Sequence, residues 1–518
     1  MTANERMVQR LEHLLRNHIS HCTDGADCRR TSLSHPSTSS VARAHYHHTN
    51  MLEEPRDEDA SPNGMAMTFI EERTSAFFGE SSNINFARLL LRATAAVRQP
   101  TQGEHTAMEK DYTLVENRMA RLSRLRASPS ATSIDLAESS MIALPSIEAM
   151  ENMLDVYFDT CGVVFPFIHE QTFRATFAEC KANAFTRVRR TWLGTLNMIF
   201  AMASKFDQDE DNGASTKSRG RTSNIYYTRA VSLCGDLSKR VISLEVVHYL
   251  VLVVIFCQGS SRSVEAWNVH GLLVRSAIAL GLHSNRSREV LDSCTQESRH
   301  RTWLVIYGLD KVLSMTFGRP AAISDELMTT PQPSTWLPVT SPSALQNELD
   351  LPGQFLAVSF ELYQVMSRSL VKQYGANMGN VDLELDELAS LQASSNFRKA
   401  LREWTAKLPP HLHLCEPRSD MLSENTQVNR LRVILSLRYH NLSILVHRPL
   451  LTTTIRHLFK VDLQQEKVSS YLLQPAMAEA HECIHAAQST VNIVYEVMTT
   501  DSSSKNNLGV WSFTLYYG

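Results

Sequence analysis

Hydrophobic residues recur at helical spacing over most of the chain from about residue 141 onward. Positions three and four apart share one face of an α-helix, so this period predicts amphipathic helices that bury one side. Ala266, Val269 and Leu273, for example, fall on a single helix face. No run alternates strictly between apolar and polar residues, as a half-buried strand would. We therefore predict an all-α fold, with helices over 147–158, 188–203, 225–241, 244–257, 264–281, 299–317, 354–374, 397–407, 428–451 and 476–498.

Glycine, proline and polar runs mark the breaks between these helices. Gly281 is expected to close the helix at 264–281, and Gly318-Arg319-Pro320 to stop the helix at 299–317. Two polar interruptions, 207–222 and 329–350, have the composition of surface loops.

The N-terminal part of the chain has a different character. Residues 1–22 show helical periodicity and predict a short helix. Residues 23–140 contain too few large apolar side chains to offset the entropy lost on ordering, so we predict mostly disordered linker. A short ordered island is expected within it near 64–97. Residues 141–518 then form one large multi-helix domain.

Composition and charge narrow the class of protein. Hydrophobic residues make up 43% and charged residues 20% of the chain, enough apolar material for a sizeable core. Lys plus Arg number 51 against 54 Asp plus Glu, a net charge of −3. This balance argues against a chain that is basic throughout, as many nucleic-acid binders are. Any DNA contact would need a local patch or a segment outside these residues.

Cysteine usage and apolar runs point to a reduced intracellular compartment without a membrane segment. The nine Cys are an odd number, and none forms a CxxC pair, so neither a disulfide framework nor a structural zinc site is encoded by their spacing. The first residues lack the apolar core of a signal peptide. The apolar run Val246 to Cys257 is shorter than the about 20 residues that cross a bilayer, and predicts a buried helix.

One string has the form of a zinc-hydrolase motif. His481-Glu482-Cys483-Ile484-His485 is an HExxH, in which two His one turn apart bind zinc and the Glu acts as general base. Such a site needs a third ligand, but Gln488 stands where one continuation requires Gly, and no Glu lies at the distance that the other requires. We interpret the string as a helix that carries two His, with a helical metallohydrolase as a remote alternative.

Other candidate chemistry is incomplete. The string 411–415 alternates His and Cys without four ligands, and the acidic run 207–211 lacks the second motif of a magnesium-dependent cyclase. No GxSxG, phosphate-binding loop or dinucleotide fingerprint is present. We therefore predict no catalytic, cofactor-binding or metal-binding residue. A further cluster near the start lacks the Cys pair that a zinc finger needs, and consists of His13, His18, His21, Cys22 and Cys28.

Short strings distributed along the chain carry a family resemblance by their order and spacing. In the body they are LPS (144–146), VFPFIH (164–169), SLEVV (243–247), LGLH (280–283), GRP (318–320), HRP (447–449) and WSFTLYY (511–517), and FFGESSN (77–83) precedes them. Together they resemble the regulatory domain of fungal zinc-cluster transcription factors, also called the fungal-specific transcription factor domain or middle homology region. The resemblance covers roughly residues 64–517.

The resemblance implies a fungal, nuclear regulator of RNA polymerase II transcription. Members bind DNA through an N-terminal Zn2Cys6 cluster with zinc as cofactor, and a short coiled coil after the cluster joins them as homo- or heterodimers. Residues 1–22 resemble such a dimerisation helix, but the six cysteines are missing, so these residues themselves support neither zinc nor direct DNA contact. We also expect truncation at the C-terminus, because the family continues beyond the position of Gly518. A small-molecule inducer is a further expected partner.

Two hypotheses about the function follow from this resemblance. In the first, the chain is a transcription regulator, not an enzyme, whose zinc cluster lies outside these residues. In the second, it is a DNA-binding-deficient interaction protein that acts through a heterodimer. In both, a network of charged residues around the Gly-Arg-Pro turn is expected to have a structural or regulatory role: Arg299, Arg301, Asp310, Arg319 and Asp325.

Overall fold

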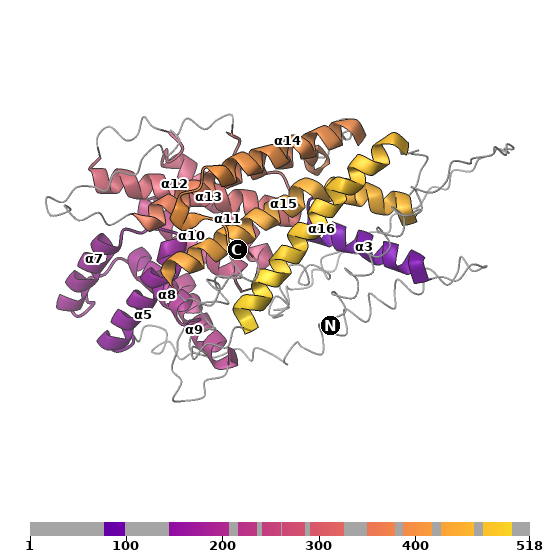
Figure 1. The fold of residues 1–518 in the computed structure, drawn as a ribbon. Coiled ribbons are helices and arrows are strands. Elements are labelled where there is room, and N and C mark those ends of the chain that lie inside the picture. Colours follow the sequence, from indigo (N-terminus) through magenta and orange to yellow (C-terminus); the bar gives the residue numbers. More distant parts are fainter. Residues whose placement is uncertain are drawn as a thin grey trace, which may run out of the picture. The chain divides into compact units, whose positions relative to one another are not determined.

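The computed structural model describes residues 77–98, 144–206, 216–235, 241–260, 262–284, 291–325, 350–378, 387–416, 426–459 and 470–499. The chain divides into two compact units, 1–58 and 59–518, and all of the described residues belong to the second. These residues form helices and contain no β-strand, which confirms the predicted all-α class (Figure 1). The expected helix at 1–22, most of the linker at 23–140 and the segment 511–517 lie outside the described residues. The proposed division at residue 141 stays a prediction.

The described α-helices, in chain order, are α3 (Asn83–Arg98), α5 (Ile147–Asp159), α6 (Cys161–Val164), α7 (Glu170–Ala182), α8 (Arg190–Ala203), α9 (Thr216–Cys234), α10 (Leu244–Gln258), α11 (Ser263–Ala279), α12 (Ser293–Phe317), α13 (Leu351–Gln373), α14 (Glu387–Ala406), α15 (Gln427–Phe459) and α16 (Ser470–Thr499). Two 3-10 turns, η5 (Gly375–Met378) and η7 (Pro410–Leu412), lie between the later helices.

Side chains at the helix ends explain where several of these elements begin and stop. Ser146, Ser243 and Asp292 each accept a hydrogen bond from a backbone N–H in the first turn of the helix that follows. This N-capping satisfies a donor that has no partner inside the helix. At the other end of α12, Gly318 takes a left-handed conformation with φ of 64°, which Gly adopts without steric cost. The predicted stop at Gly318 is confirmed.

Several parts of the sequence prediction were wrong. Helix α14 begins at Glu387 and not at the predicted 397, and α15 continues to Phe459, beyond the predicted 451. The stretch 170–182 forms α7, although its weak apolar pattern did not single it out as a helix. The loop expected over 207–222 ends at Thr216, where α9 begins, and α9 ends at Cys234, short of the predicted 241. Helices α7 and α9 have more polar surface than the core helices, so packing on a neighbour, here α8 for α9, adds to weak intrinsic propensity.

Helix α10 is buried on every side. It packs against α8 and α11, and its residues from Val246 to Gln258 are buried apart from His248, which is half-buried. A helix that is apolar around its whole circumference belongs inside a core. The prediction of a buried helix at this run is confirmed, and among the described helices none is both long and apolar enough to cross a membrane.

Residues 77–98, which fall mostly within the island expected at 64–97, pack against this helical body. Helix α3 packs against α15 and α12, next to the α15–α16 pair (Figure 1). Its buried apolar residues are Ile84, Leu89 and Ala93, of which Leu89 and Ala93, four positions apart, share one helix face. The two parts of the chain joined by residues 99–143 are therefore held together by apolar packing.

Candidate functional site

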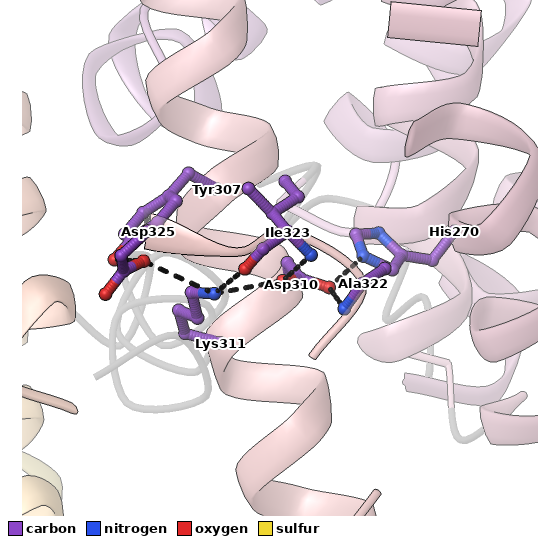
Figure 2. A network of polar contacts seen from close by, with 7 residues as sticks. All are labelled: His270, Tyr307, Asp310, Lys311, Ala322, Ile323 and Asp325. Carbon is purple, nitrogen blue, oxygen red and sulfur yellow. Dashed lines mark hydrogen bonds and ion pairs between the residues drawn. The ribbon is translucent and has the colours of Figure 1, made fainter. Parts of the chain in front are cut away.

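A buried carboxylate forms the centre of a polar network between α11, α12 and the turn after α12. The Asp310 side chain is 2% exposed, and its Oδ1 lies 3.1 Å from His270 Nε2. It also accepts backbone hydrogen bonds from Ala322 N at 3.0 Å and Ile323 N at 3.1 Å. Figure 2 shows these groups converging on Asp310 from both sides. The carboxylate therefore fixes the backbone of the turn to the helix.

Lys311 supplies the opposite charge. Its side chain is 1% exposed, and Nζ donates to Ile323 O at 2.5 Å while lying 3.3 Å from Asp310 Oδ2 and 3.7 Å from Asp325 Oδ1. The Tyr307 hydroxyl donates to Asp325 Oδ1 at 2.8 Å, and the Tyr307 ring lies 4.7 Å from the ammonium (Figure 2). A buried lysine is tolerated when it is paired and hydrogen-bonded, as it is here.

The protonation states follow from these contacts. Burial alone would raise the pKa of the Asp310 carboxyl, but the hydrogen bond from His270 and the charge of Lys311 outweigh it and lower that pKa. Burial, with the charge of Asp325 nearby, raises the pKa of the Tyr307 phenol. At neutral pH the carboxylate is charged and the phenol is neutral, so the network is an ion pair with hydrogen-bonded neighbours. We name His270, Tyr307, Asp310, Lys311 and Asp325 the polar network.

The turn that the polar network holds also contacts the N-terminal island. Residues 77–83 run across it, and we name them the strap. Gly79 N donates to Gly318 O at 3.1 Å, and Arg319 Nε donates to Phe77 O at 3.0 Å. The Arg319 guanidinium also lies over the Phe78 ring, 5.4 Å from its centroid. The beginning of the strap is thus attached to the beginning of the turn.

A second clamp holds the end of the strap. Arg448, in α15, donates to Ser81 O, and its Nη1 donates to Asn83 Oδ1 at 3.4 Å. Asn377 Nδ2 donates to Ser81 Oγ at 2.7 Å. Ser81 and Ser82 are completely buried, so these polar groups are enclosed by protein. Such buried hydrogen bonds are costly to break because the separated groups lose their solvent.

The five charged residues predicted around the Gly-Arg-Pro turn fall into separate groups. Asp310 and Asp325 both contact Lys311, so they share the polar network. Arg319 contacts the strap, as described above. The other two bind elsewhere: Arg299 donates to Leu280 O at 2.6 Å, and Arg301 pairs with Glu297 and with Asp350, the latter at 2.5 Å. A regulatory role for any of the five stays a prediction.

The sequence reasoning missed three members of the network, His270, Tyr307 and Lys311. A signal existed for Lys311, because it follows Asp310 in an otherwise apolar part of α12, where a solvated lysine is unusual. His270 had no such signal, since nothing in the sequence indicates which helix faces α12.

The HExxH string lies on α16, where its Glu482 takes part in ion pairs between helices. Glu482 pairs with Arg398 of α14 at 3.8 Å, and the same arginine lies 3.0 Å from the buried Glu479. Glu479 Oε2 is in turn 2.6 Å from Nδ1 of the buried His447. Nowhere in the described ranges do three or more His, Cys, Asp or Glu side chains come together as a metal site would require. These carboxylates connect α14, α15 and α16.

The remaining sequence candidates make local contacts or lie elsewhere. His413 Nε2 is 3.2 Å from Leu408 O, and Cys415 N donates to Ser436 Oγ at 2.8 Å, so the 411–415 string lines the end of α14 and the start of α15. The acidic run 207–211 and the cluster of His and Cys near the start lie outside the described residues.

The described residues do not fit a zinc cluster. A Zn2Cys6 site needs six thiolates that converge on two ions, but among the described residues no three His, Cys, Asp or Glu side chains come together, and all described cysteines except Cys294 are buried. Burial raises the pKa of the Cys161, Cys257 and Cys483 thiols to about 12, which disfavours the thiolate that zinc binds.

Comparison with known proteins places this arrangement in a family. The fungal specific transcription factor domain matches residues 154–377, which include the whole polar network. Transcription factor FBD3 of Gibberella moniliformis is 55% identical over 99% of this chain and 70% of that protein, and FBD3 of Fusarium pseudograminearum is 51% identical with the same coverage. An ABC-transporter-regulating transcription factor of Aspergillus fumigatus is 23% identical over 72% of this chain and 40% of its own length. No solved structure matches.

The identity to the two FBD3 proteins extends over nearly the whole chain, and therefore over the strap as well as the body. The order of motifs that carried the resemblance is thus the order of a shared fold, and the resemblance is confirmed. The chain belongs to the fungal transcription regulators that carry the fungal-specific transcription factor domain.

Proposed function

We propose that the described helical body is the regulatory part of a nuclear regulator that acts by binding and not by catalysis. DNA contact is made by a Zn2Cys6 cluster that lies outside these residues or on a partner chain. The net charge of −3 supports this division, because a duplex-binding surface needs an excess of Lys and Arg. The buried charged groups also support it, since their contacts hold helices and turns in place.

The single observation that carries the proposal is the attachment of the strap to the body. Gly318 and Arg319 bind its beginning, and Arg448 binds its end. In a regulator with an N-terminal DNA-binding domain, the strap lies between that domain and the helical body. A body that holds or releases the strap can transmit the binding of a dimer partner or a small-molecule inducer toward the DNA-binding domain.

One feature of the sequence supports the hypothesis that the chain acts as a heterodimer. The nine Cys contain no CxxC pair, so a DNA-reading cluster is supplied by other residues or by another chain. The homodimer and heterodimer hypotheses therefore predict different results when the purified chain is tested for DNA binding.

The test uses the full chain, tagged and expressed in a fungal cell, with three measurements: nuclear fractionation, chromatin immunoprecipitation and transcript profiling after deletion. We expect nuclear enrichment, recruitment to chromatin and a defined set of changed transcripts. DNA binding by the purified chain alone would point to a reading surface on this chain, and binding only with a co-purified zinc-cluster partner would point to a heterodimer. A chain outside the nucleus whose deletion changes no transcript would overturn the proposal.

A control variant separates regulation from hydrolysis. Glu482→Gln removes the carboxylate that a hydrolase would use as general base but keeps a residue of the same size at the exposed pair with Arg398. We expect unchanged transcript profiles in this variant and no stoichiometric zinc in the purified chain. A changed profile in this variant, together with stoichiometric zinc in the wild-type chain, would favour the metallohydrolase alternative.

A further inference from the structure

We propose that the turn of residues 318–325 is a latch that couples the polar network to the strap, so that disturbing the network releases the beginning of the strap. The proposal rests on the proposed function only for its effect on transcription. The coupling itself is a physical property of the described residues and is tested separately.

The first step is the contact between the start of the latch and the strap. Gly318 O accepts from Gly79 N, and a Cβ built on Gly318 would lie 2.5 Å from Gly79 O and 2.6 Å from Gly79 N. The two backbones are therefore in direct contact, with no side chain between them. Because the two backbones touch, a shift of the latch directly changes the hydrogen bond between Gly79 N and Gly318 O.

The second step is the anchoring of the other half of the latch. Asp310 holds the N–H groups of Ala322 and Ile323, and Lys311 holds Ile323 O. This part of the chain is irregular, so side chains take the place of a helical or sheet ladder for these backbone groups. The conformation of the latch thus depends on Asp310 and Lys311, two side chains of α12 whose hydrogen bonds to the latch do not involve the strap.

The third step is that the strap has two clamps, only one of which is the latch. Ser81 is held by Arg448 and Asn377, which belong to other elements. Helix α3, beyond the strap, has its own apolar contacts through Ile84 and Leu89. Loosening the latch therefore frees the beginning of the strap while α3 stays docked. This graded release distinguishes a latch from general unfolding.

The test is hydrogen exchange of the full-length protein, read by mass spectrometry on peptides covering 77–82, 84–94 and 320–325. Asp310→Asn is expected to speed exchange of the Gly79 amide about tenfold and to leave 84–94 as in the wild type. Tyr307→Phe, which removes the hydroxyl that donates to Asp325 and also interacts with Ser367, is expected to have a smaller effect in the same direction. Asp155→Asn is the matched control, because it breaks an exposed pair with Arg174 on α7, and should leave all three peptides unchanged.

The outcomes separate the inference from the proposed function. Faster exchange at 320–325 with wild-type exchange at Gly79, in either variant, would overturn the latch. If Asp310→Asn fails to fold by circular dichroism, Tyr307→Phe decides the question alone. Faster exchange at Gly79 with an unchanged transcript profile would leave the latch standing and would remove the role of the strap in regulation. A changed profile with wild-type exchange at Gly79 would overturn the latch, because the network would then affect transcription without releasing the strap.

Discussion

Gly79 and Gly318 meet backbone to backbone: the N–H of the first donates to the carbonyl of the second at 3.1 Å, although they are far apart in the sequence. Gly318 has φ of 64°, so it serves at once as the C-cap of α12 and as the docking point of the strap. A side chain at Gly318 would be strained in this conformation and would crowd the strap backbone. The strap and the body thus depend on the same residue.

Replacing Gly318 by Ala should therefore destabilise the protein. The left-handed conformation alone costs a non-glycine residue about 1–2 kcal/mol, and the crowding of Gly79 adds to this. The measurement is the free energy of unfolding in urea. Gly271→Ala is the matched control, because Gly271 lies inside α11 with no atom near its added Cβ, and it should stabilise the protein by about 0.5–1 kcal/mol. Equal effects of the two substitutions would contradict the assigned role of Gly318.

Asp310→Asn should be among the most destabilising polar substitutions in the body. It leaves the buried Lys311 without its closest carboxylate, and uncompensated buried charges cost about 3–5 kcal/mol. The exposed pair of Asp155 with Arg174 provides the control, since Asp155→Asn should cost about 0–1 kcal/mol. Denaturant unfolding of the three proteins measures the difference, and a loss below about 1 kcal/mol for Asp310→Asn would be inconsistent with a charged network.

The pH dependence of this difference has a defined sign. The pKa of Asp310 is lowered in the folded protein, so the unfolded state takes up the proton first as pH falls. The stabilisation is complete above the unfolded pKa of about 3.9 and is lost as pH falls through the folded value. The gap in unfolding free energy between wild type and Asp310→Asn should be constant from about pH 7 to 5 and shrink below about pH 4. A gap that widens on acidification would refute this assignment.

The HExxH region offers a second matched pair of substitutions. Glu479 is buried between His447 and Arg398, whereas Glu482 is 44% exposed and 3.8 Å from the same arginine. Glu479→Gln should cost about 3–5 kcal/mol and Glu482→Gln about 0–1 kcal/mol, measured by urea unfolding. If Glu482→Gln proved the more harmful, the interpretation of these carboxylates as connections between α14, α15 and α16 would be wrong.

The helical class and many helix positions could be predicted from the sequence because they depend on local features. Apolar spacing located α10 and α11, and the glycine at 318 located the end of α12. The prediction failed for α7 and for the start of α9, where packing on other helices adds to weak local propensity. The family could also be identified from ordered motifs, without knowledge of their contacts.

The candidate site could be predicted only in part. Asp310 and Asp325 were grouped because both lie close in sequence to the same turn, and both contact Lys311. Arg299 and Arg301 were grouped with them for the same reason. They point to other partners, because positions around a helix separate residues that are adjacent in sequence.

The sequence by itself determined the class of the fold, the caps that bound its helices and the family of regulators to which the chain belongs. These properties follow from periodicity, capping chemistry and motif order, all of which are local. Only the tertiary structure decided that Lys311 compensates Asp310 inside the core, and that the strap at Gly79 rests on Gly318. The reason is physical: buried charges and close backbone contacts depend on which elements meet, and packing between distant segments sets that.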